Sequence, residues 1–109
     1  MHVGIYDRLK DVAREGSYTT YADIAPLAAL DMAVAADRDE ITRILGEIAR
    51  HEQNAARPML TAVVIHQNDN LPGNGFFTIA REFGRFDGVD PSMFWINSLN
   101  EVHKFWQSQ

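Results

Sequence analysis

Residues 37–53, which read DRDEITRILGEIARHEQ, carry the clearest structural signal in the chain. Four branched apolar side chains recur there with helical spacing and share one helix face: Ile41, Ile44, Leu45 and Ile48. The four residues in front of this stripe, Asp37-Arg38-Asp39-Glu40, have the pattern of a capping box, which starts helices. The stretch therefore predicts an amphipathic helix that begins near residue 37 and ends at about residues 51–53.

A second amphipathic helix is expected near the start of the chain, over about residues 3–15. Its apolar face consists of Ile5, Leu9, Val12 and Ala13. Gly16 follows, and glycine commonly ends helices because it adopts a left-handed backbone without strain. Thr20-Tyr21-Ala22-Asp23 is another capping box, and it opens a helix that Pro26 should keep short or kinked.

A short β-prone stretch is expected at Ser17-Tyr18-Thr19, and the rest of the predicted β-structure lies in the second half of the chain. Residues 59–66 (MLTAVVIH) are rich in β-branched residues and apolar on both faces, which indicates a buried strand. Residues 67–75 (QNDNLPGNG) are dense in turn formers and predict a loop. Residues 76–80 fit either the return strand of a hairpin or a helix closed by Gly84, and the favoured interpretation is a brief strand at Gly75–Phe77 that passes into a helix. Asp90-Pro91 then starts a last helix that runs to about Trp106.

Length and composition indicate a single α+β domain over residues 1–109. The chain is 46% hydrophobic, which is ample for one core. No apolar run is long enough to span a membrane, and the first residues have no secretory pattern, so we expect a cytoplasmic protein without a membrane partner. The absence of cysteine excludes disulfides, thiolate metal ligands and thiol nucleophiles.

The expected order of helix, short strand, two helices and hairpin is that of a winged helix-turn-helix. Within it, residues 16–25 (GSYTTYADIA) are similar to the G-x-x-T-T-Y-G-D-I-A motif that opens the helix-turn-helix of the DNA alkyltransferase and alkyltransferase-like family. The resemblance covers about the middle half of the chain, with residues 38–46 at the start of the family's recognition helix. It implies a winged-helix-like fold with a small β-hairpin and an extra C-terminal helix. The family's Pro-Cys-His-Arg site is absent, since Met59 and Leu60 follow Pro58, so alkyl transfer is excluded.

An arginine row on the 37–53 helix is the main candidate for contacts with a partner. Arg43 and Arg50 lie opposite the apolar face, and Arg57 follows after seven more residues, a row that can contact phosphates or base edges. Glu40 and Glu47 interleave the row, so a solvated helix face is the favoured interpretation. The net charge of −5 also lowers the expectation of nucleic-acid binding.

The main functional hypothesis is a non-enzymatic binding module that meets a protein partner or a nucleic acid through the 37–53 helix and the Asn/Gly-rich loop. Its candidate contact residues are Tyr21, Arg43, Arg50, Arg57, Asn70 and Asn74. We expect no catalytic residue, metal or cofactor in such a module, and any nucleic-acid binding should be weak and salt-dependent.

The alternative hypothesis is a small hydrolase-like enzyme with a pocket near Glu52, His66 and the Pro72–Gly75 loop. Glu52 falls on the apolar helix face and needs a cation, for which Arg57 is the nearest in sequence. The favoured interpretation is an ion pair that fixes the following turn. Clustering of Glu52, Arg57 and His66 in one concave site would favour the enzyme, and scattering would favour the binding module.

The last helix has a broad aromatic face that needs a partner. Its members are Phe94, Trp95, Leu99, Val102, Phe105 and Trp106. Such a face either covers the core of its own domain or joins two copies of the chain, and the prediction leans towards a homodimer.

Overall fold

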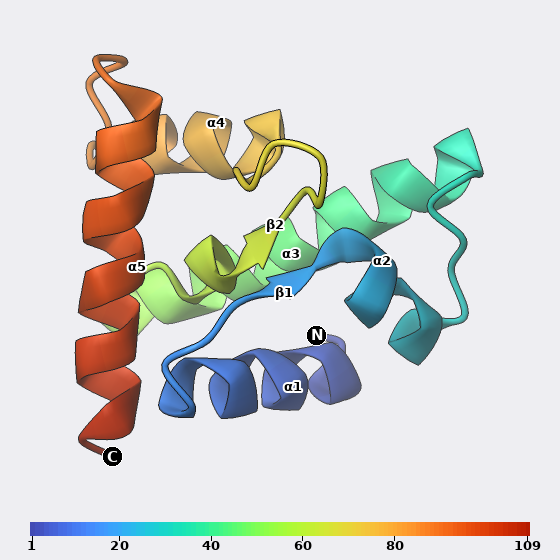
Figure 1. The fold of residues 1–109 in the computed structure, drawn as a ribbon, viewed down its shortest axis with the longest axis horizontal. Helices are drawn as coiled ribbons and strands as arrows, with labels where there is room; N and C mark the ends of the chain where they lie inside the picture. Colours follow the sequence, from blue (N-terminus) through green and yellow to red (C-terminus); the bar gives the residue numbers. More distant parts are fainter.

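The structure is a computed structural model that describes all residues from Met1 to Gln109. In chain order its elements are α1 (Val3–Arg14), β1 (Thr19–Thr20), α2 (Tyr21–Ile24), the 3₁₀ helix η1 (Ala25–Ala28), α3 (Ala35–Asn54), the 3₁₀ helix η2 (Leu60–Val63), β2 (Val64–Ile65), α4 (Asn74–Glu82) and α5 (Pro91–Gln107). The buried η2 turn lies at the centre, where α1, α3 and α5 all pack against it (Figure 1). The chain is thus a compact, mostly helical α+β protein with a very small sheet.

The predicted first helix is confirmed as α1. All four residues of its expected apolar face are buried, and the chain leaves the helix at Gly16, whose φ is +68°. The predicted cap at Thr20 is also confirmed, because its Oγ1 accepts a hydrogen bond of 3.2 Å from the Asp23 amide. Pro26 stands in the first turn of η1, so the expected short second helix becomes a four-residue α-helix followed by a 3₁₀ turn.

The longest helix, α3, buries the predicted stripe but does not start where the capping box predicts. It begins at Ala35, and Val34 before it provides no side-chain cap. The Asp37 carboxylate instead accepts a hydrogen bond of 2.9 Å from the backbone amide of Asp31. The carboxylate therefore fastens the preceding loop, and the predicted capping box at Asp37 is wrong.

The expected hairpin is also wrong, because the predicted strand 59–66 pairs in parallel with β1 and not with residues 75–77. Thr19 pairs with Val64 and Thr20 with Ile65, which joins segments far apart in the sequence. Only two residues of the predicted strand 59–66 are extended, since the chain forms the fully buried η2 turn just before them.

The segment expected to begin the return strand is helical instead. The chain folds back after β2 through two hydrogen bonds: the His66 amide donates to the Leu71 carbonyl (2.8 Å) and the Asn70 amide donates to the His66 carbonyl (2.9 Å). It then enters α4 at Asn74. Phe76 and Ala80, four residues apart, are the buried residues of α4, which is the spacing of a helix face and not of a strand.

The last helix, α5, covers the core. It packs against α1 and η2 (Figure 1). The Trp95 indole nitrogen donates a hydrogen bond of 2.8 Å to the Ala62 carbonyl of η2. Val102 and Trp106 are buried there. Much of the aromatic face is therefore used within the chain, and self-association through α5 stays a prediction.

No helix in this structure combines the length and the apolar composition needed to cross a membrane.

Candidate functional site

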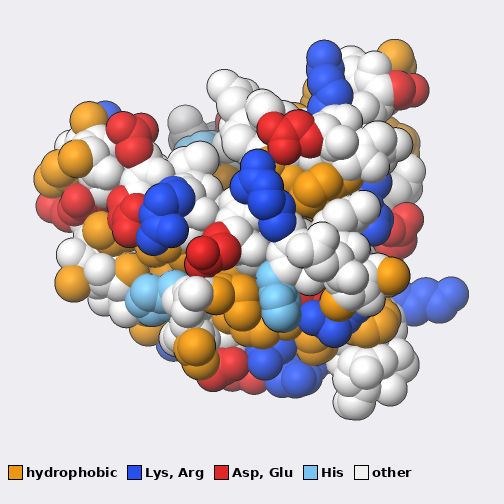
Figure 2. All heavy atoms as spheres, turned by 180° about the vertical axis from the view of Figure 1, so that it is seen from behind, with side chains coloured by type: hydrophobic (Ala, Val, Ile, Leu, Met, Phe, Trp, Pro, Cys, Tyr) orange, Lys and Arg blue, Asp and Glu red, His pale blue; other side chains and the backbone are white.

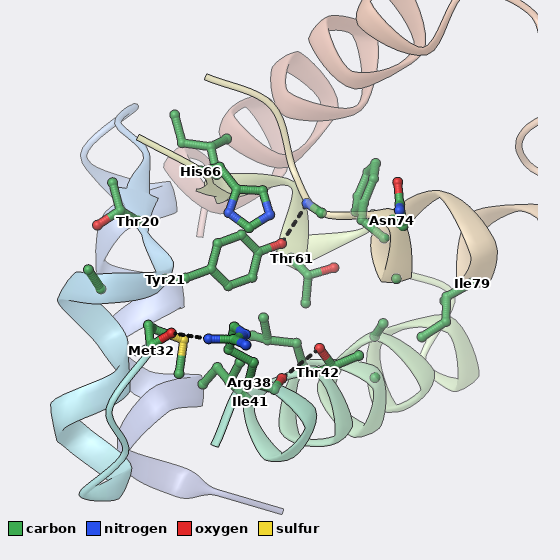
Figure 3. A pocket seen from close by; sticks show the side chains of 18 of the residues that line it. Thr20, Tyr21, Met32, Arg38, Ile41, Thr42, Thr61, His66, Asn74 and Ile79 are labelled. Atoms are coloured by element: carbon green, nitrogen blue, oxygen red, sulfur yellow. Dashed lines mark hydrogen bonds between the residues drawn. The ribbon is translucent and has the colours of Figure 1, made fainter. Parts of the chain in front are cut away.

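A cavity of about 440 Å³ lies between α3 and the first turn of α4 (Figure 3). The start of α2 and the end of β2 close its other sides. Its walls are mainly apolar, with contributions from Met32, Ile41, Leu45, Ala49, Ile65, Phe76 and Ile79. The cavity therefore forms where segments from both halves of the chain meet.

Two glycines allow α4 to approach α3 at this cavity. A Cβ atom added to Gly46 of α3 would lie 3.2 Å from Cδ1 of Ile79 in α4. A Cβ atom added to Gly75 of α4 would lie 3.2 Å from Cγ2 of Thr42 in α3. Both distances are shorter than ordinary side-chain contacts, so the helices can approach this closely because Gly46 and Gly75 have no side chain.

Tyr21 and His66 form an aromatic wall of the cavity. Their ring centroids are 4.5 Å apart with an interplanar angle of 32°. The Tyr21 hydroxyl oxygen accepts a hydrogen bond of 2.7 Å from the Gly73 amide, which ties the start of α2 to the start of α4 (Figure 3). Burial raises the pKa of Tyr21, with a smaller contribution from the charge of Asp69, so its hydroxyl stays protonated and keeps a hydrogen to donate.

Thr61 is one of the few polar residues in the mainly apolar interior. The residue is only 5% exposed, and its hydroxyl, whose oxygen is not fully buried, makes no hydrogen bond with any other group of the chain. The side chain lines the cavity, and the hydroxyl points into it (Figure 3). The Thr42 hydroxyl, in contrast, donates to the Arg38 carbonyl of its own helix at 2.9 Å.

The cavity wall contains no carboxylate, although the chain has 15 acidic residues and a net charge of −5. Its charged or chargeable members are Arg38 and His66. Arg38 is exposed at the edge, where its guanidinium donates a hydrogen bond of 2.8 Å to the Met32 carbonyl. The site is thus a local exception to the acidic balance of the molecule, with hydrogen-bond donors on several sides.

Of the residues predicted to contact a partner, two lie at this cavity and one lies close by in sequence. Tyr21 and Asn74 line it. Asn70 is exposed in the loop before α4, where it has a left-handed backbone with a φ of +56° in the turn after His66.

None of the three predicted arginines lines the cavity, and each is bound to a carboxylate. Arg43 pairs with Glu40 at 2.6 Å, and Arg50 pairs with Glu82 of α4 at 3.2 Å. Arg57 pairs with Glu52. Figure 2 shows basic and acidic side chains interspersed over one face of the molecule, without one continuous basic patch.

Glu52, Arg57 and Tyr6 form a separate buried cluster. Glu52 has no exposed surface, and it accepts hydrogen bonds from the Tyr6 hydroxyl (2.5 Å) and from Nε of Arg57. Burial and the hydrogen bond to Glu52 raise the pKa of Tyr6 to about 12. The cluster joins α1, the end of α3 and the segment before η2, which is the ion pair favoured from the sequence.

This arrangement separates the residues of the predicted hydrolase pocket. His66 lines the cavity, whereas Glu52 and Arg57 do not, and no hydrogen bond joins the His66 ring to a carboxylate. The structure also brings together no group of three His, Asp or Glu side chains that could hold a metal ion.

Sequence reasoning missed the most informative polar residue of the site, Thr61. The signal was present, because Thr61 is the single hydroxyl within the apolar run 59–65. The sequence places Arg38 in the capping box and both Arg38 and Gly46 in the segment similar to a recognition helix, without a cavity. Their role at the cavity depends on the position of α4, which the predicted strand at Gly75–Phe77 obscured.

In comparisons with known proteins, no family model, no curated protein and no solved structure matched this chain.

Proposed function

We propose that this chain is a non-enzymatic binding module that takes up a small organic molecule in the cavity between α3 and α4. The observation that carries the proposal is the composition of the cavity wall, which is apolar with a few unpaired hydrogen-bond donors and no carboxylate. Small-molecule sites are typically concave and apolar, with volumes of about 300–1,000 Å³ and a few placed polar groups. The cavity volume of about 440 Å³ fits this description.

A catalytic function has less support from the same geometry. General acid–base catalysis needs a titratable group that is oriented by a partner and within hydrogen-bonding reach of the reacting atoms. His66 is stacked on Tyr21, and the buried acid Glu52 is already bound to Arg57 and Tyr6. The cavity therefore offers recognition groups without an oriented acid–base pair.

Nucleic-acid recognition through α3 also has less support than small-molecule binding. Phosphate binding depends on cations that are free to replace counterions. Arg43 and Arg50 are each held by a glutamate, so a phosphate contact would first have to break an ion pair.

In this proposal the domain is a modified winged helix. The order α1, β1, α2, α3 and β2 supports the relation, because it follows the expected order of a winged helix-turn-helix up to the second strand. From Asn74 onward α4 replaces the return strand of the wing. The Asn-rich loop then serves to place the first turn of α4 at the cavity.

The proposal is tested by titrating the ¹⁵N-labelled protein with three small aromatic probes: benzoate, benzamide and phenyl phosphate. We expect at least one probe to bind with a Kd of about 1 mM or lower, which corresponds to about −4 kcal/mol. The amide signals of Thr61, Gly73 and Gly75 should shift, because these residues line the cavity. A well-folded protein that shows no shift with any of the three probes would contradict the proposed function.

A cavity-filling variant provides the matched control. Ala49 is 2% exposed and lines the cavity, so Ala49→Leu should place its added carbons in the ligand's space and abolish the shifts. Ala36→Leu makes the same change at an exposed position of α3 away from the cavity and should leave binding intact. Equal binding by both variants would show that the probes bind elsewhere.

A further inference from the structure

The amino end of α4 lies in the cavity wall without a side-chain cap. The helix has nine residues, and Gly73 at its N-cap position cannot provide a capping side chain. The Gly73 amide donates to Tyr21 and the Phe76 amide donates back to the Gly73 carbonyl. The amides of Asn74 and Gly75 have no acceptor within the chain. Unpaired amides at a helix start carry a partial positive charge and favour anions.

Thr61 provides a second, independent indication of a ligand at the same place. A hydroxyl that has no partner within the chain and faces a cavity is free to bond to a group that enters that cavity. The Thr61 hydroxyl is in a residue that is 95% buried, has no partner in the chain and points into the cavity. The hydroxyl oxygen is open to the cavity, so it can bind a polar atom that enters the cavity, which a valine at this position could not do.

The nearby charges agree with an anion. Arg38 at the cavity edge has a guanidinium that donates one hydrogen bond to the Met32 carbonyl and keeps further N–H groups free. The protonated hydroxyl of Tyr21 can donate as well, since its hydrogen has no acceptor in the chain. The carboxylate of Asp69 is exposed, accepts a hydrogen bond of 3.0 Å from the Leu71 amide and does not line the cavity.

We infer that the first turn of α4 and the Thr61 hydroxyl form a subsite for an anionic oxygen group, a carboxylate or a phosphate, carried by a ligand with a flat apolar body. The Tyr21–His66 wall and the apolar floor accommodate that body. The inference rests on the proposed small-molecule function of this cavity and adds the chemical class of the ligand.

The decisive experiment compares charged and neutral probes of the same shape by NMR titration. Benzoate and benzamide differ in the charge of the head group, phenyl phosphate offers the phosphate alternative, and inorganic phosphate lacks the apolar body. We expect benzoate or phenyl phosphate to bind at least about 10-fold more tightly than benzamide, because charge-assisted hydrogen bonds are stronger than neutral ones. The amide signals of Asn74 and Gly75 should shift most with the anions. The tighter of the two anions then identifies the head group as carboxylate or phosphate.

Variants of Thr61 test the hydroxyl directly. Thr61→Val should weaken anion binding about 10-fold, as expected for the loss of one hydrogen bond to a charged group, and should change benzamide binding less. Thr61→Ser keeps the hydroxyl and should restore anion binding. Thr78→Val removes an exposed hydroxyl from α4 outside the cavity and should have no effect. The shifts of Asn74 and Gly75 in the unaltered protein report on the subsite even if Thr61→Val does not fold.

Failure of the subsite can be distinguished from failure of the proposed function. Equal affinity for benzoate and benzamide, with shifts confined to the cavity, would overturn the anion subsite and leave the small-molecule function in place. Shifts of Asn74 and Gly75 with inorganic phosphate alone would support the anion subsite and overturn the apolar part of the ligand. No shift with any of the four probes would overturn both.

Discussion

Arg57→Ala is expected to destabilise the fold strongly, because it leaves a buried charge without its partner. The Glu52 carboxylate has no exposed surface and is bound by Arg57 and by Tyr6. Removing one member of a buried ion pair typically costs about 3–5 kcal/mol, since the remaining charge cannot return to water. The guanidinium also lies over the Trp106 ring at 6.0 Å, so some packing is lost as well.

That loss is large compared with the stability of a domain of this size, which is about 5–15 kcal/mol. At about 4 °C or more for each kcal/mol, the midpoint of thermal unfolding should fall by at least about 12 °C. Chemical denaturation followed by circular dichroism measures the change in free energy of unfolding directly. A loss below about 0.5 kcal/mol, the size of an ordinary surface substitution, would refute the reasoning.

Two further variants isolate the buried charge as the cause. In the double variant Arg57→Ala with Glu52→Gln no buried charge remains, so it should be more stable than Arg57→Ala alone. Arg43→Ala removes an arginine that also pairs with a glutamate, but both side chains are largely exposed, at 60% and 41%. Its unfolding midpoint should therefore stay that of the unaltered protein.

Four other outcomes can be measured on the same protein. Tyr6→Phe should lower the free energy of unfolding at neutral pH. The difference from the unaltered protein should shrink as pH rises from 10 towards 12. The pKa of Tyr6 in the folded state is about 12, above the ordinary value of 10.0, so the stability that the hydroxyl contributes is lost as it ionises. Ile44→Ala should lower the free energy of unfolding by about 2–5 kcal/mol, since Ile44 is 3% exposed within the core, and an unchanged denaturation midpoint would contradict its packing. Fluorescence anisotropy should find only weak DNA binding that disappears as salt is raised, because Arg43 and Arg50 are already paired. Light scattering should report the mass of two chains if the exposed edge of α5 joins two copies, and Ile96→Asp, at a residue that is 44% exposed there, should dissociate the dimer. A mass of one chain at micromolar concentration would remove that prediction.

The helices could be predicted because their signals are local. The apolar stripe of α3 and the cap at Thr20 each depend on residues within one or two turns, and the structure retains both. The exact start of α3 depends on a longer contact, the hydrogen bond between the Asp31 amide and the Asp37 carboxylate. A capping pattern cannot reveal that its carboxylate is used by the preceding loop.

The sheet could not be predicted because its pairing is long-range. Residues 59–65 are buried on all sides, and a continuous apolar run satisfies that environment as a strand or as a 3₁₀ turn. The short β-prone stretch at residues 17–19 indicates extended backbone next to β1, but it does not indicate the parallel pairing of Thr19–Thr20 with Val64–Ile65. The sequence contains no local signal for that register.

The candidate site lies where the strand prediction fails, and one physical cause explains both. Had residues 75–77 paired with the strand 59–66, their amides would have been used in a ladder of hydrogen bonds. The chain instead turns back at His66, and the Gly73 amide binds the Tyr21 hydroxyl. This places the uncapped first turn of α4 in the cavity wall, where Gly75 closely approaches Thr42 of α3. Predictions from local sequence rules are expected to fail where a protein keeps polar groups free for a ligand. Here the helical start of α4 leaves the amides of Asn74 and Gly75 without an acceptor in the chain, as the proposed subsite requires.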